Sequence, residues 1–235
     1  MREQNSIMTA GNRTSRDISW LTVASAAFGG TAAVIGLLAL AGWAFDNAVL
    51  KGFHPSFVTM KPNTAVGLVF LAVSIVLLSL GRDRRFARRL AGTLSLLAGV
   101  LGVLSLAESV FAFDIGIDQL LFREYPDAIE TWSPGRMAFI TGVCFLMAGL
   151  AIHVIAASYK RVQRLTDLLL SATALVAVFV LVGYLFDESG MRDLGMHGSM
   201  ALNTAMAFFF ICLGGLRLSR TGESWPRCSP VLRPA

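Results

Sequence analysis

Two short patterns of aromatic, amide and hydroxyl residues each recur three times along the chain. The first pattern reads aromatic, small residue or Leu, Phe, Asp, and the second reads Met-x-x-x-Thr followed by a small residue. The first pattern occupies residues 43–46, 111–114 and 184–187, and the second occupies residues 60–65, 137–142 and 200–205. Asn precedes Thr in the first and third copies of the second pattern. Two patterns that recur in the same order indicate an internal triplication.

The residue types in these patterns favour binding of a polar ligand group. A Thr hydroxyl or an Asn amide can hydrogen-bond a ligand, and the free N–H groups of a helix N-terminus attract carbonyl and anionic groups. If the three copies converge on one face of a membrane, they surround a cavity there. The candidate ligand-binding residues are Trp43, Met60, Asn63, Thr64, Phe111, Met137, Thr141, Tyr184, Met200, Asn203 and Thr204. The alternative is that they mark the membrane boundary and pack the helices.

Glu108 and Arg136 add two charged groups to this candidate set. Glu108 lies one helical turn before Phe111, and Arg136 directly precedes Met137. Because a charge in hydrocarbon is costly, an intramembrane acid usually faces the protein interior. Glu108 is therefore either a functional acid, with Arg136 as its partner across the loop, or a marker of the membrane boundary.

A candidate metal site centres on His197. Met196 and Met200 lie on either side of it, and imidazole and thioether groups together suit Cu(I). The alternative is a loop in which these residues bind no metal. His153 lies within an apolar segment, where packing or hydrogen bonding is the default role. The sequence contains no nucleophile–base pair, phosphate loop or zinc spacing, so it proposes neither an enzyme nor an identifiable cofactor.

Six long apolar segments must position these residues. Of the 235 residues, 55% are hydrophobic and 15% are charged, whereas soluble domains carry about 25% charged residues. A helix needs about 20 apolar residues to cross a hydrocarbon core of roughly 30 Å. The predicted spans are residues 20–44, 62–80, 90–112, 137–158, 165–186 and 199–216. The sequence therefore predicts an all-α polytopic membrane protein, built as three repeated helical hairpins at about 20–80, 90–158 and 165–217.

Basic residues are concentrated on one side of the predicted bundle. Fifteen of the twenty Lys and Arg residues lie near the two termini, between the second and third spans, or between the fourth and fifth. Because positive residues stay cytoplasmic, we expect segments 1–19 and 218–235 in the cytoplasm and residues 20–217 in the membrane. The outer loop at 115–136 is the longest. It is either a solvated acidic loop or, through a short amphipathic helix at 115–122, a lid over the cavity.

The second pattern gives the chain a resemblance to a known group of membrane regions. Residues 20–217 resemble the six-helix N-terminal sensor region that precedes PAS, histidine-kinase and diguanylate-cyclase domains in bacterial signalling proteins. In that group Met-x-Pro-Asn-Thr-Ala opens alternate helices, as Met60–Ala65 does here, whereas Phe139 and Ile140 replace Pro and Asn in the middle copy. Gly195–Met200 is also similar to MHYT-type membrane sensor domains, which repeat a Met-His pair that occurs once here.

The resemblance implies a sensor module of the bacterial inner membrane. We expect a signal-input role in which the chain detects a lipid-soluble or periplasmic cue and acts on a cytoplasmic output domain or partner. If the chain is part of a longer protein, that protein would be a histidine kinase or a diguanylate cyclase. The expected partners are membrane lipids, a small lipophilic ligand, and a signalling protein or second copy of the chain, but no nucleic acid.

Two other functions stay open at this point. One is a small transporter or channel, although such proteins usually contain broken helices and midplane charges, which are not evident here. The other is a membrane protein that binds copper or a redox cofactor, which rests on Met196, His197 and Met200 alone.

Overall fold

The computed structural model describes residues 2–54, 57–81, 83–111, 116, 121–122, 135–186 and 199–221, all of them helical or in turns and connections. Within these ranges there is no β-strand. Three features expected from the sequence lie wholly or mostly outside the described residues: the lid over residues 115–136, the metal-site residues Met196 and His197, and the tail after residue 221.

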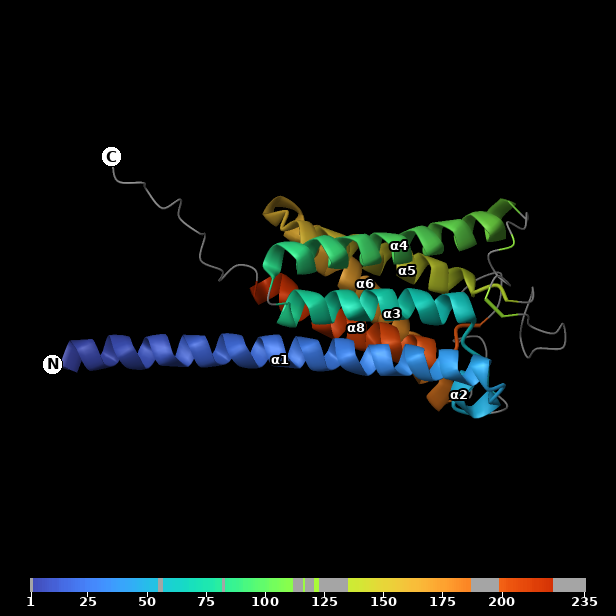
Figure 1. Cartoon of the computed structure of the whole chain (residues 1–235), viewed down its shortest axis with the longest axis horizontal. Helices are drawn as coiled ribbons and strands as arrows, with labels where there is room; N and C mark the ends of the chain where they lie inside the picture. Colours follow the sequence, from blue (N-terminus) through green and yellow to red (C-terminus); the bar gives the residue numbers. More distant parts are fainter. Residues whose placement is uncertain are drawn as a thin grey trace.

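Six helices are long and apolar enough to cross a membrane, which confirms the prediction of an all-α multi-pass membrane protein (Figure 1). The membrane-crossing part of the first one is Trp20–Ala44. Two short elements, α2 (Ala48–Gly52) and the 3-10 helix η1 (Lys160–Val162), lie in the connections. The six helices are α1 (Arg2–Ala44), α3 (Pro62–Leu80), α4 (Arg84–Phe111), α5 (Phe139–Ala157), α6 (Gln163–Leu185) and α8 (Leu202–Thr221).

Some helix boundaries differ from those predicted. Helix α4 begins at Arg84 rather than at residue 90, because the Asp83 carboxylate accepts hydrogen bonds from the backbone amides of Arg85 and Phe86 at 3.0 and 3.2 Å. Such a cap lets a helix start among basic residues that a search for apolar runs treats as loop. Helix α8 begins three residues later than predicted and continues to Thr221.

Three of the six helices, α1, α4 and α6, surround an inner trio formed by α3, α5 and α8. Helices α3, α5 and α8 contact one another, and each outer helix packs between two of them: α1 between α8 and α3, α4 between α3 and α5, and α6 between α5 and α8. The most apolar windows of α3, α5 and α8 are 56%, 50% and 56% buried, against 33%, 39% and 28% for α1, α4 and α6. The second helix of each predicted hairpin is therefore the inner one.

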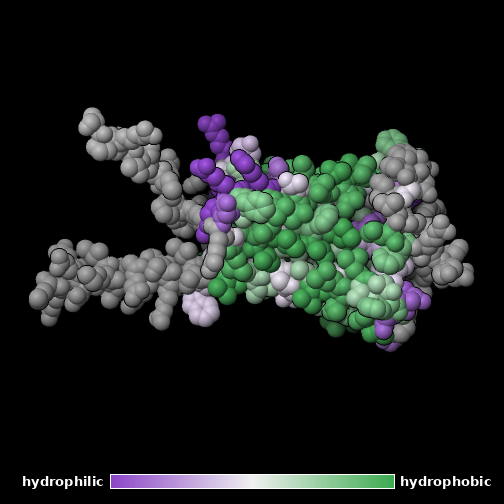
Figure 2. All heavy atoms as spheres, in the orientation of Figure 1, coloured by the Kyte–Doolittle hydropathy of each residue, from purple (hydrophilic) through white to green (hydrophobic). Residues whose placement is uncertain are grey.

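The two ends of the bundle differ in character. We call one end the motif end, because α1, α4 and α6 finish there and α3, α5 and α8 begin there (Figure 1). The opposite end is the arginine end, where α4 begins with Arg84, Arg85, Arg88 and Arg89. Between them lies a continuous band of hydrophobic side chains, with hydrophilic side chains at its margins (Figure 2). This distribution is the one expected when hydrocarbon surrounds the middle of a protein.

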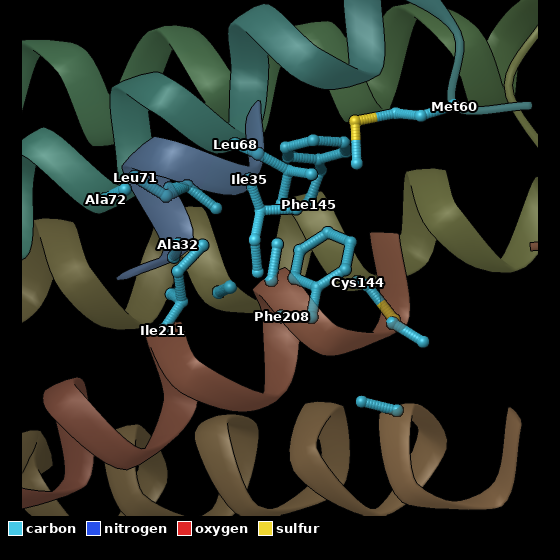
Figure 3. Packing of buried hydrophobic residues seen from close by; sticks show 14 of the residues in the cluster. Ala32, Ile35, Met60, Leu68, Leu71, Ala72, Cys144, Phe145, Phe208 and Ile211 are labelled. Atoms are coloured by element: carbon cyan, nitrogen blue, oxygen red, sulfur yellow. The ribbon is translucent and has the colours of Figure 1, made fainter. Parts of the chain in front are cut away.

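The centre of the bundle is filled by side chains from the inner helices. The rings of Phe145 in α5 and Phe208 in α8 have centroids 4.9 Å apart in an edge-to-face arrangement, and Leu68 of α3 lies next to them (Figure 3). A Cβ atom added to Gly67 would lie 2.6 Å from the Phe145 ring, so this glycine gives the ring its space. We call Leu68, Phe145 and Phe208 the central plug; none of the three is exposed.

Helices α4 and α5 approach each other most closely at glycines. A Cβ atom on Gly149 would lie 2.8 Å from the Ser95 carbonyl oxygen and 2.9 Å from Gly99 Cα. Both of these are backbone atoms, which cannot rotate away as a side chain can. Small residues that let helix backbones approach are the usual means of helix association in lipid, where van der Waals packing drives the contact.

We therefore expect Gly149→Ala to destabilise the protein by about 1–3 kcal/mol, the usual cost of overpacking a core. The measurement is thermal unfolding of the purified protein in detergent. Gly30→Ala is the matched control, because a Cβ at Gly30 would meet nothing within 4 Å. Equal melting temperatures for the two variants would contradict the close contact.

Candidate functional site

The second sequence pattern places each of its residues at the same position of an inner helix. Its Met lies two residues before the first helical residue in all three copies, and its Thr is the third helical residue. Met60, Met137 and Met200 are 1–2% exposed and belong to the hydrophobic core. The methionines are therefore core residues, and the side chains that follow them lie where each inner helix begins.

In two copies the aromatic residue of the first pattern hydrogen-bonds the Met carbonyl of the second. Trp43 Nε1 donates to the Met60 carbonyl oxygen at 2.8 Å, and the Tyr184 hydroxyl donates to that of Met200 at 3.0 Å. Phe111 occupies this position in the middle copy, and its side chain is 72% exposed. A phenyl ring has no N–H or O–H to donate, which accounts for its different orientation.

The Asn side chains of the pattern accept hydrogen bonds from backbone amides in the first turn of their own helices. Asn63 Oδ1 accepts from the Thr64 amide at 2.8 Å, and Asn203 Oδ1 accepts from the Thr204 amide at 3.1 Å. The first amides of a helix have no partner within the helix, so each Asn satisfies one of them. In the middle copy Ile140 offers no acceptor, and the Thr141 amide bonds the Ala138 carbonyl instead at 2.9 Å.

The threonine hydroxyls of the second pattern differ from its other polar groups in their hydrogen bonding. Thr64, Thr141 and Thr204 are each 2% exposed. Among the described residues, none of their hydroxyls has a hydrogen-bond partner. A buried polar group without a partner costs about 1–3 kcal/mol, so these three hydroxyls are candidates for hydrogen bonds to a bound molecule.

The central plug defines where these hydroxyls lie. Its residues follow the threonines by four positions in each inner helix, and residues four apart share one face of a helix. Because Phe145 and Phe208 are in contact, the threonine-bearing faces of α5 and α8 turn toward each other one turn nearer the motif end. The threonines thus form a layer above the plug, at the start of three helices whose N-termini carry partial positive charge.

Lys51, which the sequence analysis did not single out, joins two of the copies. Its carbonyl oxygen accepts from the Met60 amide at 2.9 Å and from Asn203 Nδ2 at 2.8 Å. Its ammonium group lies 4.4 Å from the centroid of the Trp43 ring and 2.5 Å from Asp46. The hydrogen bond from Lys51, together with its charge, holds the pKa of the exposed Asp46 carboxyl below its usual range.

Aromatic residues of the connecting loops cover the patterned aromatic residues of other hairpins. Phe57 lies 5.2 Å from the Tyr184 ring, and Phe122 lies 6.0 Å from the Trp43 ring, measured between centroids. Each contact joins residues more than sixty positions apart. Such contacts cannot be predicted from local spacing.

For Lys51, the sequence offered one signal of a special role: it is a basic residue on the side of the bundle where basic residues are few.

Glu108 lies inside the protein near the motif end. Its side chain is 1% exposed, and Arg136 Nη1 approaches the Glu108 carbonyl oxygen at 3.5 Å. In the other copies the equivalent positions, three residues before the patterned aromatic, hold Leu40 and Leu181, which pack against the core. The middle copy therefore exchanges an apolar residue for a buried acid. The contact of Arg136 with Glu108 is to the backbone carbonyl, so a pairing of the guanidinium group with the Glu108 carboxylate stays a prediction.

The candidate copper ligands are only partly described. Of the three, Met200 is buried in the hydrophobic core, while Met196 and His197 lie outside the described residues. Within the described part of the chain, no three His, Cys, Asp or Glu residues are grouped so that they could hold a metal ion. His153 instead lies with Nδ1 2.9 Å from the Gly92 carbonyl oxygen.

Comparison with known proteins assigns no relative: no family model, curated protein or solved structure matches this chain. The geometry of the motif end is therefore the basis for interpreting the site.

The hydrogen bonds from the patterned aromatic residues lead to a direct test. We expect Trp43→Phe and Tyr184→Phe each to destabilise the protein by about 0.5–1.5 kcal/mol, the usual contribution of one such bond. Thermal unfolding in detergent measures the loss. Tyr159→Phe is the matched control, because Tyr159 is exposed at the opposite end of the bundle. A Tyr184→Phe variant as stable as Tyr159→Phe would show that the bond to Met200 contributes nothing.

Proposed function

We propose that the chain consists of three copies of a two-helix unit arranged around a common axis. Equivalent positions of the inner helices are buried alike: the threonines are each 2% exposed, and the plug residues four positions later are each 0% exposed. The hydrogen bonds from Trp43 and Tyr184 join the two patterns of a copy in the same way. These agreements support a triplication better than shared composition does.

We propose further that the arginine end faces the cytoplasm of a bacterial inner membrane. Fifteen of the twenty Lys and Arg residues belong to that side of the chain, and positive residues next to membrane spans are retained in the cytoplasm. The motif end would then face the periplasm, and both termini would be cytoplasmic.

Cysteine labelling tests this orientation. In a chain with Cys228→Ser, the remaining Cys144 and Cys212 are buried, whereas Ala48 at the motif end and Arg161 at the other end are exposed. We expect a membrane-impermeant maleimide to label Ala48→Cys in intact spheroplasts and Arg161→Cys only after permeabilisation. The reverse pattern would invert the topology.

For the function, we propose a sensory module that binds a small carbonyl-bearing or anionic ligand at the motif end. The observation that carries this proposal is the layer of buried Thr64, Thr141 and Thr204 hydroxyls, which have no hydrogen-bond partner among the described residues. Three hydroxyl donors beside three helix N-termini would bond a ligand oxygen and stabilise negative charge on it.

A ligand at this layer would contact all three copies at once and would draw the beginnings of α3, α5 and α8 together. These helices continue to the arginine end, so their displacement would reach a cytoplasmic partner, an output domain or a second copy of the chain. The central plug favours a sensor over a channel, because Leu68, Phe145 and Phe208 occupy the axis that a substrate would have to follow.

Replacing the hydroxyls with methyl groups tests the proposed site. The variant Thr64→Val/Thr141→Val/Thr204→Val keeps the side-chain shapes but removes the three hydroxyls. Each lost hydrogen bond to the ligand contributes about 0.5–1.5 kcal/mol, so we expect ligand retention to weaken by at least about tenfold. Mass spectrometry of small molecules that co-purify with each protein provides the measurement. Because the hydroxyls have no partner in the described protein, the ligand-free variant should melt at the same temperature as the unmodified protein, or higher.

Thr173→Val is the matched control. Thr173 is equally buried, but its hydroxyl donates to the Leu169 carbonyl at 2.9 Å. This variant should lose stability and keep its ligand. A triple variant that retains the same amount of the same molecule as the unmodified protein would contradict the site.

A further inference from the structure

A large hollow lies at the arginine end between α4 and α5, at the opposite end of the bundle from the threonine layer. Its volume is about 660 Å³, and four arginines line it: Arg84, Arg85, Arg88 and Arg89. The rest of the lining is mostly apolar, with Thr93 and His153 as its polar residues, and no carboxylate is among the described lining residues. The apolar lining residues are Gly92, Leu96, Ala156 and Ala157. The hollow therefore has a strongly cationic mouth and an apolar extension.

The position of the arginines makes the hollow more electropositive still. They lie within the first six residues of α4, where the helix dipole is positive and basic side chains are disfavoured. Asp83 is the nearest acid in the sequence. One of its carboxylate oxygens already accepts hydrogen bonds from the backbone amides of Arg85 and Phe86. An anion placed here would gain from both the guanidinium groups and the helix N-terminus.

Arg88 has a separate, structural role among the four. Its Nε donates to the Ala156 carbonyl oxygen at 2.8 Å, and its Nη2 donates to the Ser158 hydroxyl. These bonds fasten α4 to the last turn of α5 and fix the width of the hollow. Arg85 and Arg89, one helical turn apart and both exposed, can bind an anion without breaking that contact.

An apolar stripe continues from the arginines along α4. Leu96, Val100 and Val103 follow Arg89 at helical spacing and are 51%, 44% and 45% exposed. At 1.5 Å per residue, Arg89 and Val103 are about 21 Å apart along the helix, which exceeds the roughly 15 Å thickness of one hydrocarbon leaflet. The surface thus offers a cationic pocket at the depth of the lipid head groups and an acyl-chain track below it.

From this combination we propose that the hollow binds an anionic phospholipid. The phosphate lies between Arg85 and Arg89, and one acyl chain follows Leu96, Val100 and Val103. Basic pockets between membrane helices recognise anionic head groups in this way. A zwitterionic phospholipid carries the same phosphate, but the cation on its head group is repelled by the arginines, so binding is selective for a net negative lipid.

Lipid retention measured by native mass spectrometry tests the proposal on the full chain. The protein is purified in detergent and titrated with phosphatidylglycerol or phosphatidylcholine. We expect preferential retention of phosphatidylglycerol, and about 25-fold weaker retention by Arg85→Gln/Arg89→Gln, since each basic side chain near an anionic head group contributes about fivefold. A thermal shift with each lipid should follow the same order.

Arg161→Gln/Arg164→Gln is the matched control. It removes the same two charges from the same end of the bundle, at exposed residues outside the lining of the hollow. Full retention of phosphatidylglycerol by this control supports a defined site. Equal losses in both variants would show diffuse attraction to the surface and overturn the proposal, as would equal retention of the two lipids. Stabilisation by glycerol phosphate alone to the extent seen with the lipid would reassign the hollow to a soluble anion and overturn the acyl-chain track.

Discussion

The beginnings of the three inner helices impose the constraint on which the rest of the structure depends. Each begins inside the bundle, where its first amides and the preceding carbonyls have little access to water and must find partners in the protein. Trp43, Tyr184, Asn63 and Asn203 supply those partners. In the first and third copies, the aromatic residue at the end of the outer helix therefore donates the hydrogen bond that the start of the following inner helix needs.

The middle copy lacks the side-chain hydrogen bonds that the other two copies form at the start of the inner helix. It has Phe111 in place of a hydrogen-bond donor and Ile140 in place of Asn, and the helix start closes on its own backbone through Ala138. The same copy carries the buried Glu108 at a position that is Leu elsewhere. The three occurrences of the patterns therefore share the burial of their threonine and plug residues but differ in their polar side chains.

The two ends of the bundle differ in the burial of their polar and charged groups. At the motif end, helix N-termini and threonine hydroxyls surround a buried layer, and the protein satisfies most other polar groups itself. At the arginine end, guanidinium groups face an open hollow between α4 and α5. Hydrogen bonds at the motif end are formed in a buried environment, where they are stronger than in water, whereas the arginines at the other end are accessible to an anion.

The sequence by itself determined the six spans, because hydrocarbon thickness sets the length of an apolar helix and composition reveals such lengths directly. The recurrence of the two patterns also predicted that their residues lie at one end of the bundle, and the described pattern residues lie where α1, α4 and α6 end and α3, α5 and α8 begin. Only the tertiary structure decided that α3, α5 and α8 are the inner helices, that Asn63 and Asn203 serve their own helix starts, and that Lys51 joins two copies. The packing of the inner helices and the bonds of Lys51 depend on contacts between distant residues, which hydropathy and local spacing do not record. The same holds for the threonine hydroxyls, which have no hydrogen-bond partner among the described residues.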